Sequence, residues 1–295
     1  MLPRVCIVTL NFNGWADTLE CIASLCNDTY PNKEIVVIDN GSTDDSVDRL
    51  RKAFPQATLI ETRKNLGFTG GNNVGLQHAL SSAAKYIYWL NNDTTSEPDA
   101  ITKLVAAAEA NPRYGILTPR IQYFDKPIDP WFAGAILNLS HGVAIHDNSR
   151  LENEGIRDVP WISGCAMFGD ARLLAEVGGF DDRFFLYWED VDLSIRVQKK
   201  GRDLGLVSAV RIYHKVSRTA SANPEGSRYY YVRNNLLLVK LQRKTAGWFA
   251  MPRVMLGRLR EGLRESRHAG NTRSLRMTLR AIFDYSCDRL GQRRE

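Results

Sequence analysis

Polar residues follow two apolar runs of the chain at points where strands would end. Residues 91 to 93, Asn-Asn-Asp, come directly after Tyr86 to Leu90, and Asp39 comes after Glu34 to Ile38. Oxygen ligands on a rigid strand edge suit Mg²⁺ or Mn²⁺, with substrate phosphate completing the coordination. The alternative is a turn in which Asn or Asp caps the next helix. Asp39 has the same alternative, and its functional interpretation is a hydrogen bond to a base or ribose.

The densest group of acids, Glu189, Asp190 and Asp192, follows the aromatic-rich run Phe184 to Trp188. A carboxylate behind an aromatic wall is partly out of water, and burial raises the pKa of a carboxyl group toward the range in which a base works at neutral pH. Asp190 is therefore the candidate general base. The competing interpretation is that these acids only open a helix, where negative charge favours the dipole. That interpretation leaves the aromatic wall unexplained.

One histidine and one glycine-rich segment add to these candidates. His214 would be structural if it stood alone, but beside Asp93 it becomes a second protein ligand for a metal. The stretch Asn65 to Asn73 is expected to be a loop that could cradle phosphates. Residues 11 to 14 lack the GxGxxG fingerprint of a dinucleotide site, and the chain has no P-loop lysine pattern. A dehydrogenase or a kinase is therefore disfavoured.

The elements that must position these residues alternate between strand and helix over the first 110 residues. Strands are expected at Val5 to Leu10, Glu34 to Ile38, Thr58 to Glu61 and Tyr86 to Leu90, and helices at Asp17 to Leu25, Ser46 to Phe54, from Asn73 to about Ala84, and Pro98 to Ala110. This order predicts an α/β fold with a parallel sheet covered by helices on both faces. The carboxyl ends of such strands form the ligand crevice, which would bring Asp39 and residues 91 to 93 together.

The second half of the chain has a different pattern. Residues 114 to 168 read as short apolar pieces separated by turns, with aromatic residues among them. Helices are expected after that at Ala171 to Val177, Asp190 to Lys200, Tyr229 to Arg243, and Arg253 to Leu290 with a break near Gly270.

The composition fits a folded chain with one large core, or one domain with a smaller appendage, because 44% of its 295 residues are hydrophobic. The five cysteines form no CxxC pair and are expected to be reduced. No signal-peptide pattern opens the chain, and no apolar run reaches the length of about 18 residues that a membrane span needs. A cytoplasmic location is expected.

The net charge of +6 belongs to the end of the chain. From Lys240 onward there are 14 of the 39 basic residues and five of the 33 acidic ones. Such a segment could touch anionic lipid or a diphosphate-linked acceptor, and the alternative is a solvated helix face. No nucleic-acid module accompanies the charge, so nucleic acid is not an expected partner.

Seven short motifs together resemble those of family 2 glycosyltransferases with the GT-A fold, especially the bacterial rhamnosyltransferase-like branch. They stand in the family's order between about residues 5 and 235, and the pair Arg233-Asn234 also resembles that branch. The motifs are VTLNFNG at 8–14, VIDNGSTD at 37–44, NLGF at 65–68, LNND at 90–93, GGFD at 178–181, EDVD at 189–192, and His214.

The resemblance implies roles position by position. The nucleoside and donor are implied to contact Thr9, Asn11, Asp39, Asn65, Gly70, Asn73, Asn91 and Asn92. The acceptor side is implied to include Trp161, Trp188 and Glu189. Asp190 matches the catalytic base, and Asp93 with His214 would hold Mg²⁺ or Mn²⁺. The family's Asp-x-Asp motif begins here with Asn91, which leaves Asp93 as the main metal carboxylate and implies a lower metal affinity.

The implied protein is a metal-dependent, inverting transferase in three parts. Residues 1–113 would bind the nucleotide sugar, residues 114–235 the acceptor, and residues 236–295 would form a helical extension. The basic residues of this extension, and not the resemblance, indicate a peripheral contact with the inner face of the cell membrane. Inversion is favoured because no second carboxylate is assigned as a covalent nucleophile. The resemblance favours dTDP-L-rhamnose and a polyprenyl-diphosphate-linked or other cell-surface glycan, although UDP-sugars fit the same scaffold.

Two alternatives to a transferase stay open on the sequence. One is a catalytically silent nucleotide-sugar-binding protein. The other is a sugar-nucleotide pyrophosphorylase, which would need a glycine-rich, basic loop after the first strand, where residues 11 to 14 are short and uncharged.

Overall fold

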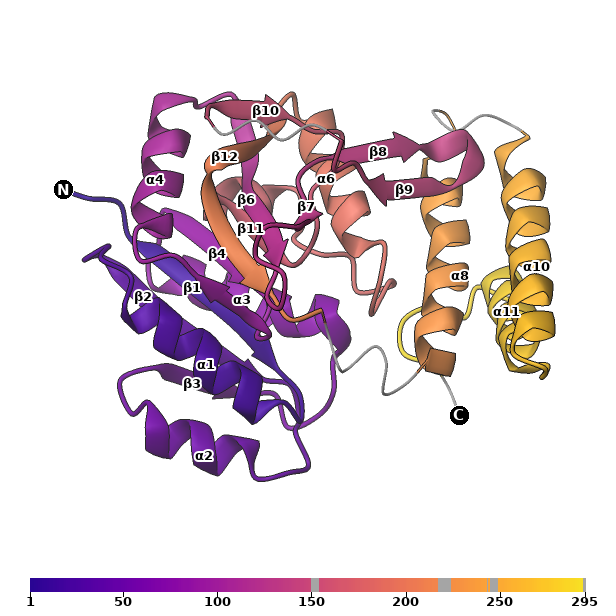
Figure 1. Ribbon diagram of the computed structural model, residues 1–295, viewed down its shortest axis with the longest axis horizontal. Helices are drawn as coiled ribbons and strands as arrows, with labels where there is room; N and C mark the ends of the chain where they lie inside the picture. Colours follow the sequence, from indigo (N-terminus) through magenta and orange to yellow (C-terminus); the bar gives the residue numbers. More distant parts are fainter. Residues whose placement is uncertain (150–153, 217–223, 243, 245–248, 294–295) are drawn as a thin grey trace.

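The structure, a computed structural model, is a mixed α/β sheet with helices on both faces and a helical layer at one end (Figure 1). It describes residues 1–149, 154–216, 224–242, 244 and 249–293. Ten of the described strands form one sheet: β1 (Val5–Asn11), β2 (Lys33–Asp39), β3 (Thr58–Glu61), β4 (Tyr86–Leu90), β5 (Thr94–Ser96), β6 (Tyr114–Tyr123), β7 (Pro130–Phe132), β10 (Ile156–Asp158), β11 (Ala166–Asp170) and β12 (Asp203–His214). A separate hairpin pairs β8 (Ala135–Asn138) with β9 (Val143–His146).

The main sheet runs in the order β10-β12-β6-β11-β4-β1-β2-β3. Strands β4, β1, β2 and β3 are parallel neighbours, and β12 is parallel to β6. Strand β11 lies antiparallel between β4 and β6, so it is the reversed strand at the centre. The expected α/β fold with a central sheet flanked by helices is confirmed, and the reversed strand β11 joins its two halves. Strands β10, β5 and β7 are also antiparallel to their neighbours.

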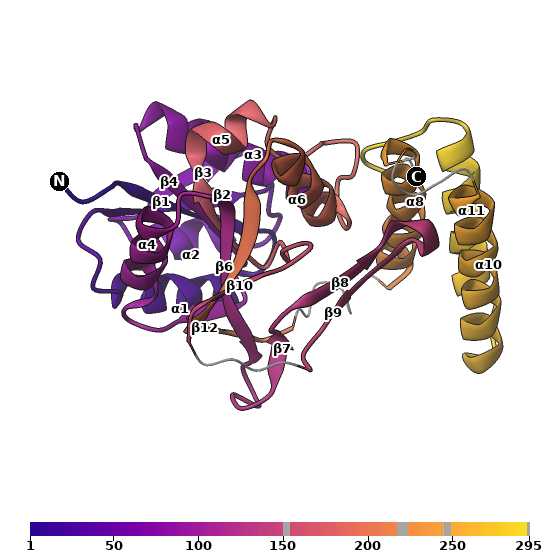
Figure 2. The same ribbon diagram turned by 90° about the horizontal axis from the view of Figure 1, so that it is seen from above.

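Helices cover the two faces of the sheet as the alternating pattern predicts (Figure 2). On one face lie α1 (Trp15–Cys26), α2 (Ser46–Ala53) and α4 (Ala100–Ala110). On the other face lie α3 (Gly67–Ser81), α5 (Ala171–Glu176) and α6 (Glu189–Lys199). All five cysteines are free thiols, as expected.

Helix α3 corrects one expectation, because the stretch from Asn65 to Asn73 is helical from Gly67 onward. The glycines that suggested a loop instead let the helix approach the sheet. A Cβ on Gly71 would lie 2.3 Å from Leu10 of β1, and one on Gly75 would lie 2.3 Å from Val8. Glycine lowers helix propensity, but here close packing against β1 requires it.

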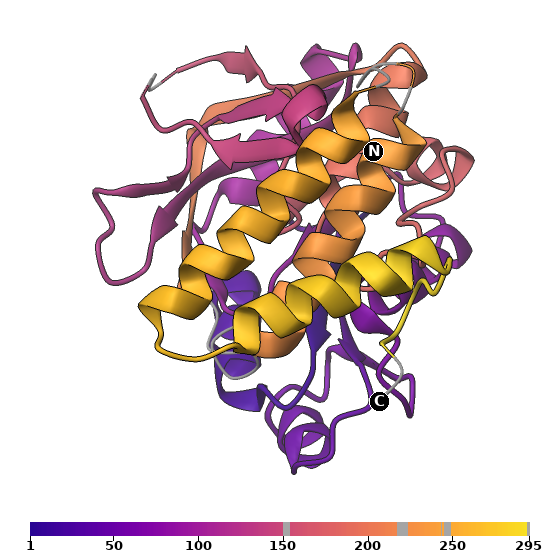
Figure 3. The same ribbon diagram turned by 90° about the vertical axis from the view of Figure 1, so that its right-hand side faces the viewer.

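The C-terminal part forms a helical layer of α8 (Pro224–Leu241), α10 (Ala250–His268) and α11 (Arg273–Ser286). Helix α8 lies between the sheet domain and the outer pair, which crosses in front of it (Figure 3). The break between α10 and α11 falls near Gly270, as expected, and Arg243, the expected end of α8, lies outside the described residues. Among the described helices, none is long and apolar enough to cross a membrane.

Candidate active site

The ends of β1, β2 and β4 are linked by a network of polar side chains. Asn11 donates to the Asp39 carboxylate at 2.8 Å, and Asp39 also accepts the hydroxyl of Ser42 at 2.7 Å. Thr18 donates to the side-chain oxygen of Asn11 at 2.8 Å and accepts the amide of Asn92 at 2.9 Å. The expected meeting of these strand ends is therefore observed, and helix α1 supplies the bridging hydroxyl.

Thr9 lies away from this network. Its side chain is fully buried, and its hydroxyl faces the thiol of Cys21 in the core. Asn65 lies at the start of α3, where its side-chain oxygen accepts the main-chain N–H of Gly67 at 2.8 Å. Thr9 thus packs inside the sheet domain, whereas Asn65 stays at the edge of the site.

Two further predicted donor contacts lie on α3. The carboxamide of Asn73 donates to the Phe180 carbonyl at 2.8 Å and accepts the Phe180 N–H at 2.9 Å. Asn73 also donates to Asp182 at 3.0 Å. Gly70 lies one turn earlier and faces Leu66 and Asp182. The structure therefore uses Asn73 to tie α3 to the segment around Phe180, which precedes the candidate base.

Asp93 and His214 meet as the sequence predicts. The Asp93 carboxylate lies 3.1 Å from His214 Nε2, and both side chains are largely buried. The antiparallel pairing of β5 with β12 sets His214 opposite Thr94, the residue after Asp93. The ring of Trp131 stands edge-on against His214, with 4.5 Å between ring centroids. Two strands and one indole thus fix the pair.

The Asp93–His214 pair fits a divalent cation that takes its remaining ligands from substrate. Neither ring nitrogen of His214 makes a hydrogen bond of normal geometry within the described residues. A buried imidazole beside a carboxylate is a suitable donor set for Mn²⁺ or Mg²⁺ when diphosphate oxygens and water complete the shell. Within the described chain, no group of three or more His, Cys, Asp or Glu side chains could hold a metal ion. Any cation held here would therefore depend on substrate ligands.

Asp190 opens helix α6 and is held by main-chain donors. Its carboxylate accepts the N–H of Gly164 at 3.0 Å and that of Val191 at 2.8 Å. Burial raises the pKa of Asp190 above its ordinary value, and these two N–H donors oppose that rise. The position and the direction of the shift suit a general base.

A two-residue segment connects the base to Asn91, two residues before Asp93. Gly164 donates to Asp190, and the carbonyl of the next residue, Cys165, accepts the N–H of Asn91 at 2.9 Å. A Cβ on Gly164 would lie 3.2 Å from the Phe68 ring and 3.5 Å from Cβ of Asp190. The segment thus fits tightly between α3 and α6. Local sequence patterns do not single out this segment, because its only signal is a glycine at the end of a short apolar piece.

Glu189 precedes the base and is buried. Its Oε2 makes no hydrogen bond within the described residues. Burial raises the pKa of Glu189 well above its ordinary value, and the neighbouring charge of Asp190 adds to the rise. The surroundings of Glu189 therefore disfavour a second negative charge beside the base.

The backbone before α6 is strained. Phe185, Tyr187 and Trp188 have φ values of 66°, 68° and 71°, which are in the left-handed region. Such conformations cost about 1–3 kcal/mol each in non-glycine residues and persist only where their surroundings hold them. The segment therefore needs external support to deliver Asp190.

That support comes from α8. Asn234 is fully buried, and its amide donates to the carbonyls of Phe184, Leu186 and Tyr187 at 2.6, 2.6 and 3.1 Å. Arg233 is equally buried and donates to the Phe184 carbonyl at 3.0 Å. The Arg-Asn pair noted in the sequence thus holds the strained segment from the C-terminal side.

Trp161 and Trp188, expected on the acceptor side, are both buried. Trp161 is 5% exposed and Trp188 is 4% exposed. The indole N–H of Trp161 donates to the Ile136 carbonyl at 3.1 Å, and that of Trp188 donates to the Tyr231 carbonyl at 3.0 Å. Large aromatic rings favour the core when their one polar atom has a partner, and both rings follow that preference.

Comparison with known proteins places this geometry in a family. The family model described as Glycosyl transferase family 2 matches residues 5–178. A protein of Mycobacterium tuberculosis named N-acetylglucosaminyl-diphospho-decaprenol L-rhamnosyltransferase is 27% identical, over 83% of this chain and 86% of its own. A hexosyltransferase of low-salt glycan biosynthesis, Agl10 of Haloferax volcanii, is 22% identical over 72% of this chain and 68% of its own.

Solved structures share the fold. GalNAc-T7, crystallised with UDP, GalNAc and Mn²⁺, superposes with a TM-score of 0.68 at 17% identity. The match covers 97% of this chain and 58% of that chain. TarS of S. aureus, as residues 1–349, has a TM-score of 0.56 at 15% identity, over 80% of this chain and 65% of that one. At such identities the likeness concerns the fold alone.

Proposed function

The chain belongs to glycosyl transferase family 2, and we propose that within this family of sugar transferases it is a metal-dependent, inverting rhamnosyltransferase. The observation that carries the proposal is the Gly164-Cys165 segment, which bonds to Asp190 on one side and to Asn91 on the other. A candidate base and a candidate diphosphate site are thereby fixed to one rigid piece of backbone. That arrangement suits a displacement between two bound substrates.

The proposed donor is dTDP-L-rhamnose, and the proposed acceptor is a lipid-diphosphate-linked glycan. The mycobacterial relative supports both, because its name gives an L-rhamnosyl transfer to N-acetylglucosaminyl-diphospho-decaprenol and its match covers most of both chains. The family membership removes the pyrophosphorylase alternative. A silent nucleotide-sugar binder would not need a carboxyl with a raised pKa at Asp190, which supports an active enzyme.

In the proposed mechanism, Asp190 accepts the proton of an acceptor hydroxyl as that oxygen attacks the anomeric carbon. The N–H groups of Gly164 and Val191 orient the carboxylate, and burial raises its pKa, which favours uptake of a proton. Burial also raises the pKa of Glu189, which disfavours a second negative charge beside the base. One in-line attack opposite the departing diphosphate inverts the anomeric centre.

Asp93 and His214 would hold the divalent cation, and Asn91 would hold one of its waters or the ribose. A bound cation of this kind supplies charge that stabilises a departing diphosphate. The network of Asn11, Asp39 and Ser42 would receive the nucleoside. We also propose that residues 1–113 bind the donor and residues 114–235 the acceptor, with residues 236–295 as an extension.

A transfer assay tests the proposal. The purified chain is incubated with Mn²⁺, a lipid-diphosphate-linked N-acetylglucosamine, and dTDP-L-rhamnose, a UDP-sugar or a GDP-sugar. We expect product only from dTDP-L-rhamnose, with NMR giving an anomeric configuration opposite to that of the donor. Product with the donor's configuration would contradict inversion, and product from a UDP-sugar alone would contradict the donor. Donor binding with neither transfer nor hydrolysis would assign a silent binder.

A further inference from the structure

The outward side of α10 combines arginine with leucine at helical spacing. Its exposed residues recur every three or four positions, so they form one stripe along the helix. They include Arg253, Leu256, Arg260, Leu263, Arg264 and Arg267. Leu256 is 47% exposed and Leu263 is 38% exposed. Two exposed leucines thus stand among four arginines along the stripe.

The outward side of α11 repeats this composition. Arg273 and Arg276 are exposed in its first turns, and Leu279 and Phe283 follow at 51% and 56% exposure. Helices α10 and α11 lie side by side as the outermost layer of the molecule (Figure 3). The two stripes, from Arg253 to Arg267 and from Arg273 to Phe283, are called the α10–α11 face below.

The acids of these two helices are engaged with residues of α8. Glu261 and Glu265 lie 3.4 and 3.1 Å from the guanidinium of Arg228 on α8. Asp284 is buried and accepts the hydroxyl of Tyr229, also on α8, at 2.8 Å. The Glu265 side chain is 43% exposed but is paired with Arg228, whereas the side chains of Glu261 and Asp284 are 28% and 9% exposed. A merely solvated helix face would carry charges of both signs.

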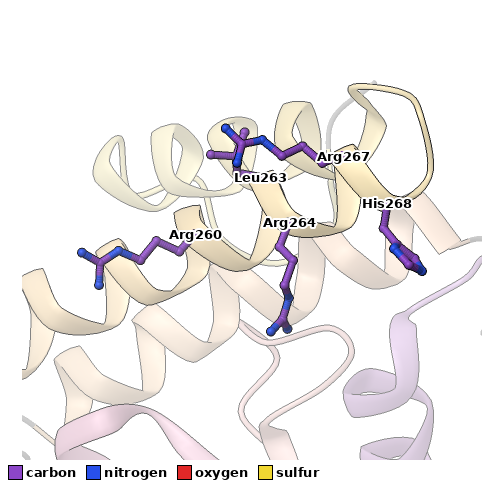
Figure 4. Close-up of a pocket in the computed structure, with 5 residues that line it drawn as sticks. All are labelled: Arg260, Leu263, Arg264, Arg267 and His268. Carbon is purple, nitrogen blue, oxygen red and sulfur yellow. The ribbon is translucent and has the colours of Figure 1, made fainter.

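The arginines of α10 spread along the helix and do not converge on one point. Arg260, Arg264 and Arg267 line a shallow, open pocket with Leu263 and His268, and their side chains extend in different directions (Figure 4). A site for one phosphate would aim several donors at one position. Diverging cations with apolar residues between them suit an extended anionic surface instead.

We propose that the α10–α11 face docks on an anionic lipid bilayer. Leucine and phenylalanine would enter the boundary between headgroups and acyl chains, while arginines stay at the headgroup level. Each basic residue near an anionic leaflet strengthens such binding by about fivefold. A polyanion without an apolar layer would bind the arginines but leave Leu279 and Phe283 exposed to water. An anionic bilayer offers contacts to both kinds of residue.

Contacts from α10 connect this face to the acceptor half. Arg258 donates to the Gly142 carbonyl at 2.8 Å, and Arg253 donates to the Ser140 carbonyl at 3.4 Å, at the tip of the β8–β9 hairpin. At the other end of the hairpin, His146 Nδ1 donates to the carbonyl of Trp131 at 2.7 Å, and the Trp131 ring packs on His214. The docking surface and the site are therefore parts of one packed unit. The inference stands without the proposed donor or acceptor.

Vesicle flotation tests the face. The full chain is mixed with vesicles of phosphatidylcholine alone or with added phosphatidylglycerol, at low and high salt. We expect the wild type to bind only to the anionic vesicles. Arg260→Glu with Arg264→Glu should lower its partitioning onto them at least about 25-fold, because each residue contributes about fivefold. Leu279→Ser with Phe283→Ser should weaken binding at both salt concentrations, because salt does not screen apolar burial.

A matched control reverses two charges elsewhere. Lys52 on α2 and Arg172 on α5 are exposed on the sheet domain, so Lys52→Glu with Arg172→Glu changes the net charge equally and should leave binding unchanged. Thermal unfolding of each variant confirms folding. Equal binding by the two charge-reversed variants would overturn the proposal. Light scattering gives a second test. If the wild type were a dimer and Leu279→Ser with Phe283→Ser made it monomeric, a second copy of the chain would cover the face, and the proposal would be overturned.

Discussion

The side-chain amide of Asn234 lies 2.6 Å from the carbonyl oxygen of Phe184 and donates a hydrogen bond to it. These residues are 50 positions apart, one on α8 and one in the segment that leads into the base. The same amide reaches two more carbonyls of that segment, whose backbone is left-handed at Phe185 and Tyr187. Helix α8 therefore supports the segment that leads into Asp190.

Replacing Asn234 by Asp should lower both stability and turnover. A carboxylate cannot donate, so the three carbonyl oxygens would face a buried negative charge. We expect unfolding to become easier by roughly 1–3 kcal/mol, as for a buried group that loses its partner. We also expect kcat to fall while the donor KM stays near the wild-type value. Asn27→Asp, the same change at an exposed position, is the control for both measurements. Unchanged kcat with lowered stability would limit Asn234 to a structural role.

Replacing Asp190 by Asn should abolish transfer but preserve donor binding. General base catalysis contributes about 10²–10⁴-fold, and the amide cannot accept the hydroxyl proton. Its oxygen can still accept the N–H of Gly164, so the local geometry should survive. Single-turnover kinetics and calorimetric titration of the donor separate the two effects. Near-normal turnover in this variant would remove Asp190 from the role of base.

The pH profile of the wild type should report the same carboxyl group. Burial raises the pKa of Asp190, and a base works only when it is deprotonated. Activity should therefore fall as the pH is lowered through that pKa, at a pH above the ordinary carboxyl value of about 4. An acid limb at or below the ordinary value would contradict the proposed environment of Asp190.

The strand ends of the site were predictable because buried strands leave a clear apolar pattern in the sequence. Asp39 and residues 91 to 93 follow such runs, and the alternation of strand and helix placed them at one edge of the sheet. The Asp93–His214 pair needed the family resemblance as well, because 121 positions separate the two residues. Their pairing depends on β5 and β12, which are antiparallel neighbours far apart in the chain.

Other features depend on tertiary contacts that local patterns do not contain. The antiparallel orientation of β11 depends on its pairing with β4 and β6, and the sequence of β11 alone does not indicate that orientation. Thr9, Trp161 and Trp188 lie in positions that match the motifs or the aromatic runs, yet the fold buries them. Asn73 is bonded to Phe180, more than 100 residues away. In each case the contact that decides the role of the residue is a long-range one.

Gly71 should be essential for stability, although glycine is normally unfavourable inside a helix such as α3. Alanine normally stabilises a helix by up to about 1 kcal/mol relative to glycine. At Gly71 the added methyl would lie 2.3 Å from Leu10, and overpacking of this kind costs about 1–3 kcal/mol. Gly71→Ala should therefore lower the denaturant midpoint. Gly257→Ala on α10 is the control, because its Cβ would meet nothing within 4 Å, and it should raise the midpoint. Equal shifts in both variants would contradict the close approach of α3 to β1.

Metal removal should stop transfer, and one substitution should strengthen metal binding. Activity lost in EDTA should return with Mn²⁺ or Mg²⁺, because Asp93 and His214 supply only two ligands and substrate must complete the shell. Asn91→Asp would add a carboxylate at the start of the same turn. We expect the half-saturating Mn²⁺ concentration to fall at least about fivefold, since unit charges 4 Å apart attract by about 1 kcal/mol even in bulk water.

The neighbouring amide distinguishes a ligand from a general charge effect. Asn92 donates to the hydroxyl of Thr18, so its side chain is turned toward α1 and is already engaged. Asn92→Asp adds the same charge one residue away but should leave the Mn²⁺ requirement unchanged, apart from some loss of stability where the donor to Thr18 is removed. Equal gains in Mn²⁺ affinity from both substitutions would mean that net charge, and not a ligand at position 91, limits metal binding. Full activity of the wild type in EDTA would contradict the metal site itself.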